Sequence, residues 1–145
     1  MSLEPRRTDD LSRAESLRLL STVSFGRVAY THRSLPAVRT VNHLMDGEAI
    51  IIRTSEWSEL VSVVIDGAVV AYQADSIDPD RHLGWSVVAR GPARGVSDAD
   101  EAARYMARLA SWAAGQRDFV IRIEPAFVSG IRLVTADAGP GETGE

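Results

Sequence analysis

The side chains that could bind an anionic ligand lie on either side of one predicted hairpin turn. Asp46-Gly47, flanked by apolar and β-branched residues, is the strongest hairpin signal in the sequence. A two-residue turn there places Arg39 opposite Thr54 on one face of the hairpin. Thr40 and Arg53 then share the other face, because side chains alternate along a strand. A guanidinium and a hydroxyl on one face are suited to binding phosphate.

A helix predicted to begin directly after Thr54 adds further groups near Arg39. Its first turn contributes free backbone N–H groups and the hydroxyls of Ser55 and Ser58. A one-residue bulge would bring Arg53 to the same face. Together these groups indicate a phosphate site. Each residue alone is also explained by an ordinary strand end with a Ser or Thr helix cap.

Composition excludes several other kinds of chemistry. Lysine and arginine together number 16, all of them arginine, and the chain has no cysteine. P-loops and Schiff-base enzymes need lysine, whereas thiolate catalysis, iron–sulfur clusters, zinc knuckles and disulfides need cysteine. His32, His43 and His82 lack metal-ligand spacing, so we predict no metal site. Any side-chain cation that binds an anion here is therefore arginine.

Length and charge favour a single cytoplasmic domain. A chain of 145 residues suits one packed domain, and a net charge of −4 gives no overall attraction to nucleic acid or an anionic membrane. The longest apolar runs, such as residues 49–52, are far too short to span a membrane, and residues 1–10 lack the apolar core of a signal peptide. We expect a flexible N-terminus over 1–10, a domain over 11–135 and a disordered tail over 136–145.

The elements that must position these groups are mostly short strands. Ser12 and Glu15 predict a capped helix over 13–21, and further helices are predicted over 55–65 and after a cap formed by Ser97 with Asp100. Six or seven strands are predicted, over 26–31, 37–44, 49–54, 68–74, 85–90 with a resumption to Val96 after Gly91-Pro92, 119–123 and 128–134. This order indicates an α+β fold: a mostly antiparallel, six- to seven-stranded barrel with short flanking helices. No G-x-G-x-x-G follows a strand, which gives a Rossmann fold no support.

The order and spacing of several strings resemble the pyridoxamine 5'-phosphate oxidase-like, FMN-binding split-barrel superfamily. The resemblance covers about Leu11 to Val134. Its pieces are Leu17-Arg18-Leu19-Leu20, Phe25-Gly26-Arg27-Val28-Ala29, Pro36 through Val41-Asn42, Asp46-Gly47, Arg53-Thr54 with Ser58, Gly84-Trp85-Ser86-Val87-Val88, Gly91-Pro92-Ala93, Arg122-Ile123-Glu124-Pro125 and Val128-Ser129-Gly130.

The resemblance implies a homodimer with two flavin sites in its interface, and FMN as the cofactor. The residues that it places along the isoalloxazine ring and ribityl chain are Arg39, Thr40, Val41 and Asn42. Arg53, Thr54 and Ser58 would approach the phosphate, and Trp85 and Ser86 could reach in from the partner subunit.

One position departs from the pattern. Relatives commonly carry a lysine after the serine that matches Ser58, and this chain has Glu59 there. An anion beside a phosphate opposes FMN binding, as does Glu56 in the same predicted helix turn. A deazaflavin coenzyme, or an empty site, therefore stays open alongside FMN.

The leading interpretation is a flavin-dependent oxidoreductase that acts on a small molecule. The alternatives are a non-catalytic dimer that carries or senses a flavin, deazaflavin, haem or other small ligand, and a degenerate member whose pocket is empty. No side chain of the sequence is identified as a catalytic acid or base.

Overall fold

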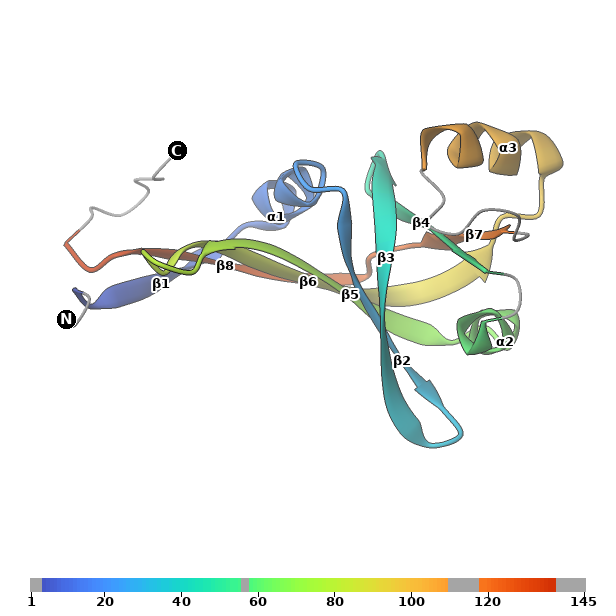
Figure 1. Ribbon diagram of the computed structural model, residues 1–145, viewed down its shortest axis with the longest axis horizontal. Helices are drawn as coiled ribbons and strands as arrows, with labels where there is room; N and C mark the ends of the chain where they lie inside the picture. The colour runs from blue at the N-terminus through green and yellow to red at the C-terminus, as the bar shows by residue number, and fades with distance from the viewer. Residues whose placement is uncertain (1–3, 56–57, 110–117, 138–145) are drawn as a thin grey trace.

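The strands form a mostly antiparallel barrel that opens on one side into a long sheet (Figure 1). The computed structural model describes residues 4–55, 58–109 and 118–137. Over these residues the elements are β1 (Arg6–Leu11), α1 (Arg13–Leu20), β2 (Phe25–His32), β3 (Leu35–Asp46), β4 (Ala49–Ser55), α2 (Glu59–Ile65), β5 (Val69–Asp78), β6 (Leu83–Gly95), α3 (Ala99–Arg108), β7 (Asp118–Ile123) and β8 (Phe127–Thr135). The strand order is β1-β8-β6-β5-β2-β3-β4-β7.

The long strand β6 closes the barrel. Its residues from Leu83 to Pro92 pair with β5, and Ala93 to Gly95 pair with β7 at the other end of the strand order. A break at Gly91-Pro92 is predicted from the sequence, yet β6 runs through it. Gly91 is required there because a β-carbon would collide with the carbonyl of Glu124. The α+β, antiparallel split-barrel prediction is confirmed, with eight described strands rather than six or seven.

The apolar runs of the sequence form the barrel interior. The side chains that are fully enclosed there include Leu20, Val28, Ile50, Ile52, Tyr72, Val87 and Ile121. A smaller cluster on the outside of β4 and β7 packs Ile51 and Val120 against Tyr105 of α3. The strand β4 is therefore buried on both faces, as its unbroken apolar sequence predicts.

The helix starts differ in detail from the predictions. The hydroxyl of Ser12 caps α1 by accepting from the backbone N–H of Glu15, as predicted. Asp98, rather than Ser97, caps α3. The helix α2 begins only at Glu59, four residues later than predicted from the sequence.

The predicted register of the β3–β4 hairpin is wrong by two residues. The turn residues are Gly47 and Glu48, and Asp46 pairs with Ala49. Gly47 has φ 59° and takes the first turn position, where a positive φ favours glycine. A shift of two keeps every side chain on its predicted face, but it removes Thr54 from its place opposite Arg39.

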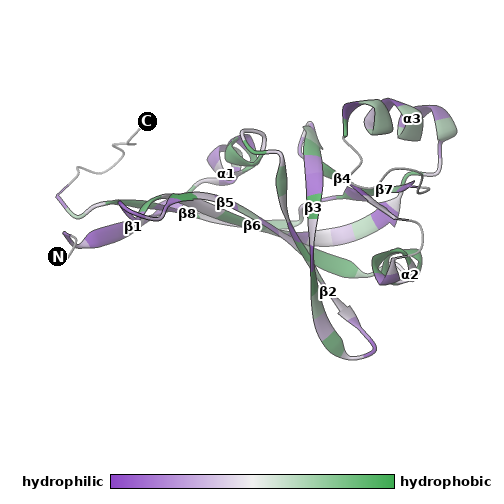
Figure 2. Ribbon diagram, viewed as in Figure 1, coloured by the Kyte–Doolittle hydropathy of each residue, from purple (hydrophilic) through white to green (hydrophobic). Residues whose placement is uncertain are grey.

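A strand forms where the sequence predicts a flexible N-terminus. Residues 6–11 pair along their full length with β8, from Arg6 with Thr135 to Leu11 with Gly130. Figure 2 shows β1 as mainly hydrophilic, which is why apolar periodicity does not reveal it. Residues 138–145 of the predicted tail lie outside the described residues. No helix in the described part of the chain is both long and apolar enough to cross a membrane.

Candidate functional site

The middle of β3 has a strand neighbour on one side only. Residues 35–42 pair with β2, whereas the pairing with β4 covers only His43 to Asp46. Over the described residues, the segment from Arg39 to Asn42 therefore faces a split between β3 and the end of β4. Backbone groups along such an edge can hydrogen-bond a ligand. The helix α2 lies beside this part of the barrel, where it packs on β2 and β6 (Figure 1).

A polar cluster lies at the inner side of this split. Arg39 pairs with Val28 across the strands, which places it on the same face as Tyr30. The hydroxyl of Tyr30 donates to Oε1 of Glu59 over 2.8 Å. Nε2 of His32 lies 3.8 Å from Oε2 of the same carboxylate. Glu59 at the start of α2 is thus held between two residues of β2.

The electrostatics of Tyr30 connect Glu59 with Arg39. Burial and then the hydrogen bond to the Glu59 carboxylate raise the pKa of Tyr30 to about 12, and the charge of Arg39 acts in the opposite direction. Tyr30 therefore stays a neutral donor at physiological pH, between a cation on β3 and an anion on α2.

Two hydroxyls extend the cluster from β4 to α2. Thr54 is buried, and its hydroxyl donates to Oγ of Ser58 over 3.3 Å. Ser58 is the N-cap residue of α2, but its side chain makes no capping hydrogen bond. Its hydroxyl hydrogen can therefore be donated to a ligand. The structure thus brings Arg39, Thr54, Ser58 and Glu59 to one region.

Arg53 lies on the opposite face of β4, and no bulge brings it to Arg39, since the register is continuous from Ile50 to Ser55. Its Nε donates to Oδ2 of Asp118 over 2.6 Å, and its Nη2 also contacts that carboxylate. Its Nη1 donates to the carbonyls of Met106 at 3.0 Å and Leu109 at 2.5 Å. These contacts fix the end of α3 and the start of β7, and they turn the guanidinium away from the split.

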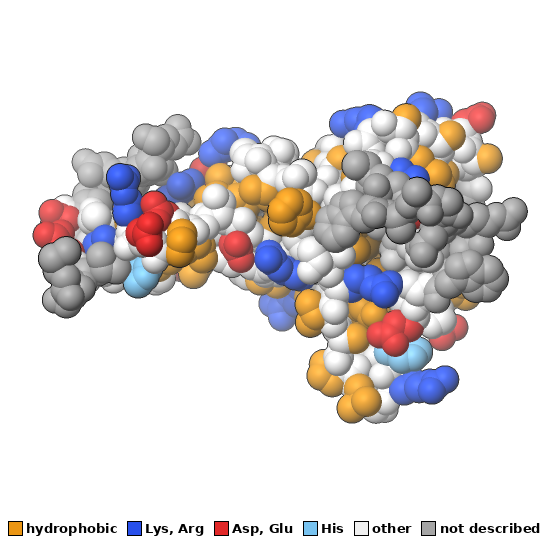
Figure 3. All heavy atoms as spheres, viewed as in Figure 1, with side chains coloured by type: hydrophobic (Ala, Val, Ile, Leu, Met, Phe, Trp, Pro, Cys, Tyr) orange, Lys and Arg blue, Asp and Glu red, His pale blue; other side chains and the backbone are white. Residues whose placement is uncertain are grey.

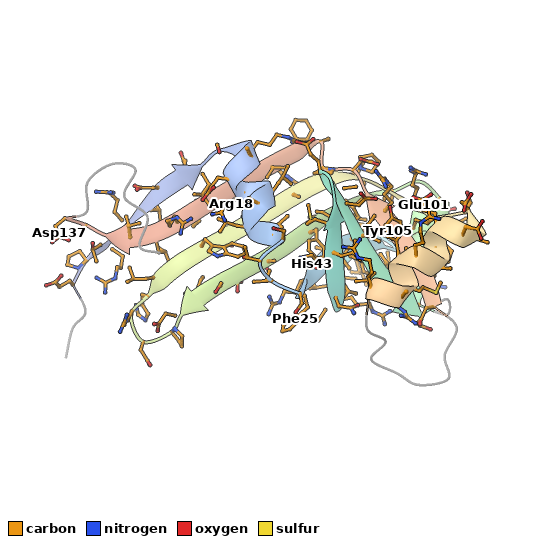
Figure 4. All side chains as sticks on the ribbon, turned by 90° about the horizontal axis from the view of Figure 1, so that it is seen from above. Arg18, Phe25, His43, Glu101, Tyr105 and Asp137 are labelled. Atoms are coloured by element: carbon orange, nitrogen blue, oxygen red, sulfur yellow. The ribbon has the colours of Figure 1, made fainter. Side chains whose placement is uncertain are left out.

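Thr40 and Asn42 lie on the outer face of β3, opposite Arg27 and Phe25 of β2. Next to them is a hollow of about 590 Å³ whose lining includes Phe25, Arg27, His43 and Asp75. Phe25 and His43 are labelled in Figure 4. Asn42 and Thr40 are thus separated from Arg39 and Val41, because successive side chains of a strand point to opposite faces.

His43 forms the floor of this hollow in a fixed, neutral state. Its Nε2 bonds the carbonyl of Leu20 at 2.7 Å, so this nitrogen carries the hydrogen, and its Nδ1 accepts from the hydroxyl of Tyr72 at 2.5 Å. Burial lowers the pKa of His43. Both nitrogens are occupied, which makes His43 a structural residue rather than a proton carrier.

Trp85 and Ser86 lie far along the sheet from Arg39. Trp85 points inward beneath α1 and is 6% exposed, whereas Ser86 lies on the outer face, where its hydroxyl accepts from Nε2 of Gln73 over 3.4 Å. Within one chain neither reaches the polar cluster. Only Ser86 faces outward, where a second molecule could approach.

The tyrosines of the chain offer a test of this packing. Burial comes first among the causes that raise the pKa of all three, Tyr30 and Tyr105 to about 12 and Tyr72 further. We expect tyrosinate absorbance at about 295 nm to stay low until well above pH 10, whereas the chain unfolded in guanidinium titrates near pH 10. Because the neutral phenols are favoured in the folded state, their stabilisation is complete below pH ~10 and falls as the pH rises towards 12. One tyrosine that titrates normally in the folded protein would contradict the contacts described.

Sequence reasoning missed the contribution of β2 to the site. Tyr30 and His32 follow Val28 at alternate positions, and this period-2 pattern was the available signal that they share a face with Arg39. Their contact with Glu59 joins residues nearly 30 positions apart and has no local signature. No group of three or more potential metal ligands occurs among the described residues.

Comparison with known proteins gives consistent matches over nearly the whole chain. A family model described as pyridoxamine 5'-phosphate oxidase matches residues 12–132. An uncharacterized protein of Mycobacterium tuberculosis, Rv0080, is 44% identical over 140 residues, which cover 93% of this chain and 91% of that protein. The structure of an FAD-binding protein from Mycobacterium smegmatis aligns with a TM-score of 0.68 and 28% identity, covering 87% of this chain and 98% of the other. An FAD-binding protein from Mesorhizobium loti shares the fold, with a TM-score of 0.77, 19% identity and coverage of 90% and 99%.

Proposed function

Since the chain belongs to the pyridoxamine 5'-phosphate oxidase family, we propose that it binds a flavin along the open edge of β3 and acts as a flavin-dependent oxidoreductase. The observation that supports this most is the one-sided pairing of Arg39 to Asn42 beside the cluster of Arg39, Thr54 and Ser58. The FAD-binding protein of M. smegmatis, with the same fold and 28% identity, adds support.

The groups present fit a flavin with a phosphate at one end. Arg39 supplies a guanidinium and Ser58 a hydroxyl hydrogen for phosphate oxygens. Backbone N–H and C=O groups of the β3 edge can bond the polar rim of the ring system. A bound flavin supplies hydride and electron transfer, while the chain orients it and shields it from water.

Glu59 adjusts the fit without preventing it. The hydroxyl of Tyr30 donates to its carboxylate, and this hydrogen bond offsets part of its negative charge. We propose FMN as the flavin, with a lower affinity than a lysine at this position would give. FAD places two phosphates at the same end and is the natural comparison in any titration.

The site is completed, in this proposal, by a second copy of the chain. The outer face of the long sheet carries an apolar row that runs directly across five strands, and no described helix covers it. The row consists of Phe127, the stem of Arg90, Ala71, Ala29 and Val38. Phe127 and Val38 at its ends are 70% and 69% exposed. The β2–β3 hairpin projects beyond this face (Figure 1), so a symmetric partner can fill the angle between them.

A single charge in this row is expected to dissociate the dimer. Val38→Asp and Phe127→Asp each place a carboxylate in the apolar row, which should weaken association at least ~10-fold. Sedimentation equilibrium at micromolar concentration should show a dimer for the unaltered protein and a shift towards monomer for the variants. Ile65→Asp, at an equally exposed apolar position on α2, is the matched control and should remain dimeric. A monomeric unaltered protein would refute the interface and the shared site.

The proposed function is tested by binding and then by turnover. The purified protein is titrated with FMN, FAD and riboflavin while flavin fluorescence is followed, and its own absorbance spectrum is recorded beforehand. Saturable flavin binding at a ratio of one per chain supports the proposal, and reduction of the bound flavin by NADH or NADPH supports the oxidoreductase. Flavin binding without reduction favours a carrier. A deazaflavin or haem spectrum in the purified protein, with no flavin binding, would overturn it.

A further inference from the structure

A second hollow lies at the other end of the sheet, away from the proposed flavin site. It has a volume of about 430 Å³ and lies between α1 and the β5–β6 hairpin. Its polar lining includes Arg18, Arg81, Arg132 and Asp78, with Trp85 beside them. Seen from above, α1 with Arg18 lies across the sheet at this end (Figure 4). Arginines thus reach one hollow from a helix, a strand and a hairpin loop.

Arg132 is the buried member of this group. It lies on β8 directly opposite Trp85 of β6, on the inner face of the sheet, and is 8% exposed. Its Nη2 donates to Oε1 of Glu15 over 3.2 Å. Its Nε is buried and has no hydrogen-bond partner in the protein. A buried guanidinium N–H without an acceptor is unfavourable, so the structure has a donor here that lacks its partner.

The charges around the hollow leave a positive excess. Arg18 bonds both oxygens of Glu15, the carboxylate that also receives Arg132, so two cations share one anion. Among the described residues, the carboxylate beside the Arg81 guanidinium is that of Asp78, at 3.9 Å. Asp9, which pairs with Arg132 across the strands, is bound by Arg7. Figure 3 shows basic side chains on this end of the molecule, with acidic ones among them.

The carboxylates cannot reverse that excess at neutral pH. Hydrogen bonds from Arg18 lower the pKa of Glu15, and hydrogen bonds from backbone N–H groups of Arg81 and Asp80 lower the pKa of Asp78. Both are therefore ionised, and three arginines face two carboxylates. Among the described side chains at the hollow, arginines therefore outnumber carboxylates, in a chain whose net charge is −4.

We propose that this hollow binds a phosphate group, with Arg132 and Arg18 as its principal ligands. A phosphate supplies the acceptor that Nε of Arg132 lacks, and it can take a second bond from the planar guanidinium of Arg18. The largely buried Trp85 also lines the hollow. The ligand is inorganic phosphate or the phosphate end of a small phosphomonoester, and the site is separate from that of the flavin.

Titration with inorganic phosphate tests the proposal. The unaltered protein is titrated at constant ionic strength, with binding followed by calorimetry and by the NMR signal of the Trp85 indole. We expect saturable binding below ~10 mM, and a loss of about tenfold in Arg18→Gln. Arg132→Gln should lose more phosphate affinity. If Arg132→Gln does not fold, Arg18→Gln still tests the proposal. Arg104→Gln, on the exposed side of α3, is the matched control and should bind as the unaltered protein does.

Two further measurements distinguish this site from the flavin site and from a hollow that binds no phosphate. Arg39→Ala should bind phosphate normally whether or not the chain binds a flavin. If it does bind a flavin, the flavin-loaded protein should also bind phosphate normally. Displacement of phosphate by FMN, with weaker FMN binding in Arg18→Gln, would show that the hollow belongs to the flavin site and would overturn a separate one. Absence of saturable binding, or equal binding in all variants, would refute the phosphate site.

Discussion

Replacement of Arg53 by alanine is expected to lower the free energy of unfolding by about 2–4 kcal/mol, because breaking a largely buried ion pair leaves its partner uncompensated. The side chains of Arg53 and Asp118 are 17% and 11% exposed. The change also removes the donor that the carbonyls of Met106 and Leu109 share. Three elements lose a common anchor: β4, β7 and the end of α3.

Urea unfolding at fixed protein concentration measures the change. Asp118→Ala should cost a similar amount, and the double variant should cost less than the two single losses together, because the pair is coupled. Arg104→Ala on α3 is the control and should stay within about 0.5 kcal/mol of the unaltered protein. Under conditions where it is folded, Arg53→Ala should bind FMN as the unaltered protein does. Normal stability combined with weak FMN binding would place Arg53 at the phosphate, as the family resemblance implies.

The strands of the barrel could be predicted because their local signals agree with the fold. The run Ala49–Ile52 is buried on both faces, and Gly47 adopts the positive φ that a tight hairpin needs. The predicted register of the β3–β4 hairpin was wrong by two residues, because an Asp-Gly pair indicates a turn but not which of the two residues takes its first position. β1 was missed because its sequence, Arg-Arg-Thr-Asp-Asp-Leu, has no apolar alternation, and pairing with β8 alone makes it a strand.

The candidate site could be predicted only where it depends on which face of a strand each side chain occupies. Arg39 and Thr54 share the inner face because a register shift of two residues does not change which face each side chain occupies. The same alternation places Arg53 on the other face of β4. It does not reveal the partner of Arg53 there, because Asp118 lies 65 residues away in the sequence. Side-chain partners between distant elements, such as Tyr30 with Glu59, depend on how α2 packs on β2. No spacing in the sequence encodes that contact.

Arg39→Ala is expected to weaken FMN binding by about 1.5–3 kcal/mol, the contribution of a hydrogen bond to a charged group, which is roughly 10- to 150-fold. Arg39 is half-buried on the inner face of β3, next to Tyr30 and at the split. Riboflavin, which lacks the phosphate, should bind the variant and the unaltered protein equally. Equal losses for both flavins would mean that Arg39 supports the strand rather than the phosphate.

Glu59→Gln is expected to strengthen FMN binding, and it removes the charge of Glu59 while keeping its contact with Tyr30. The amide oxygen of glutamine can still accept from Tyr30, so the contact between β2 and α2 is kept while the anion is removed. FMN affinity should rise about threefold to tenfold, more at low salt, and riboflavin affinity should not change. In Arg39→Ala/Glu59→Gln the gain should persist, because repulsion between a carboxylate and a phosphate does not require the arginine. If Glu59→Gln leaves FMN affinity unaltered at every salt concentration, the carboxylate faces only Tyr30 and His32, and the phosphate lies elsewhere along β3.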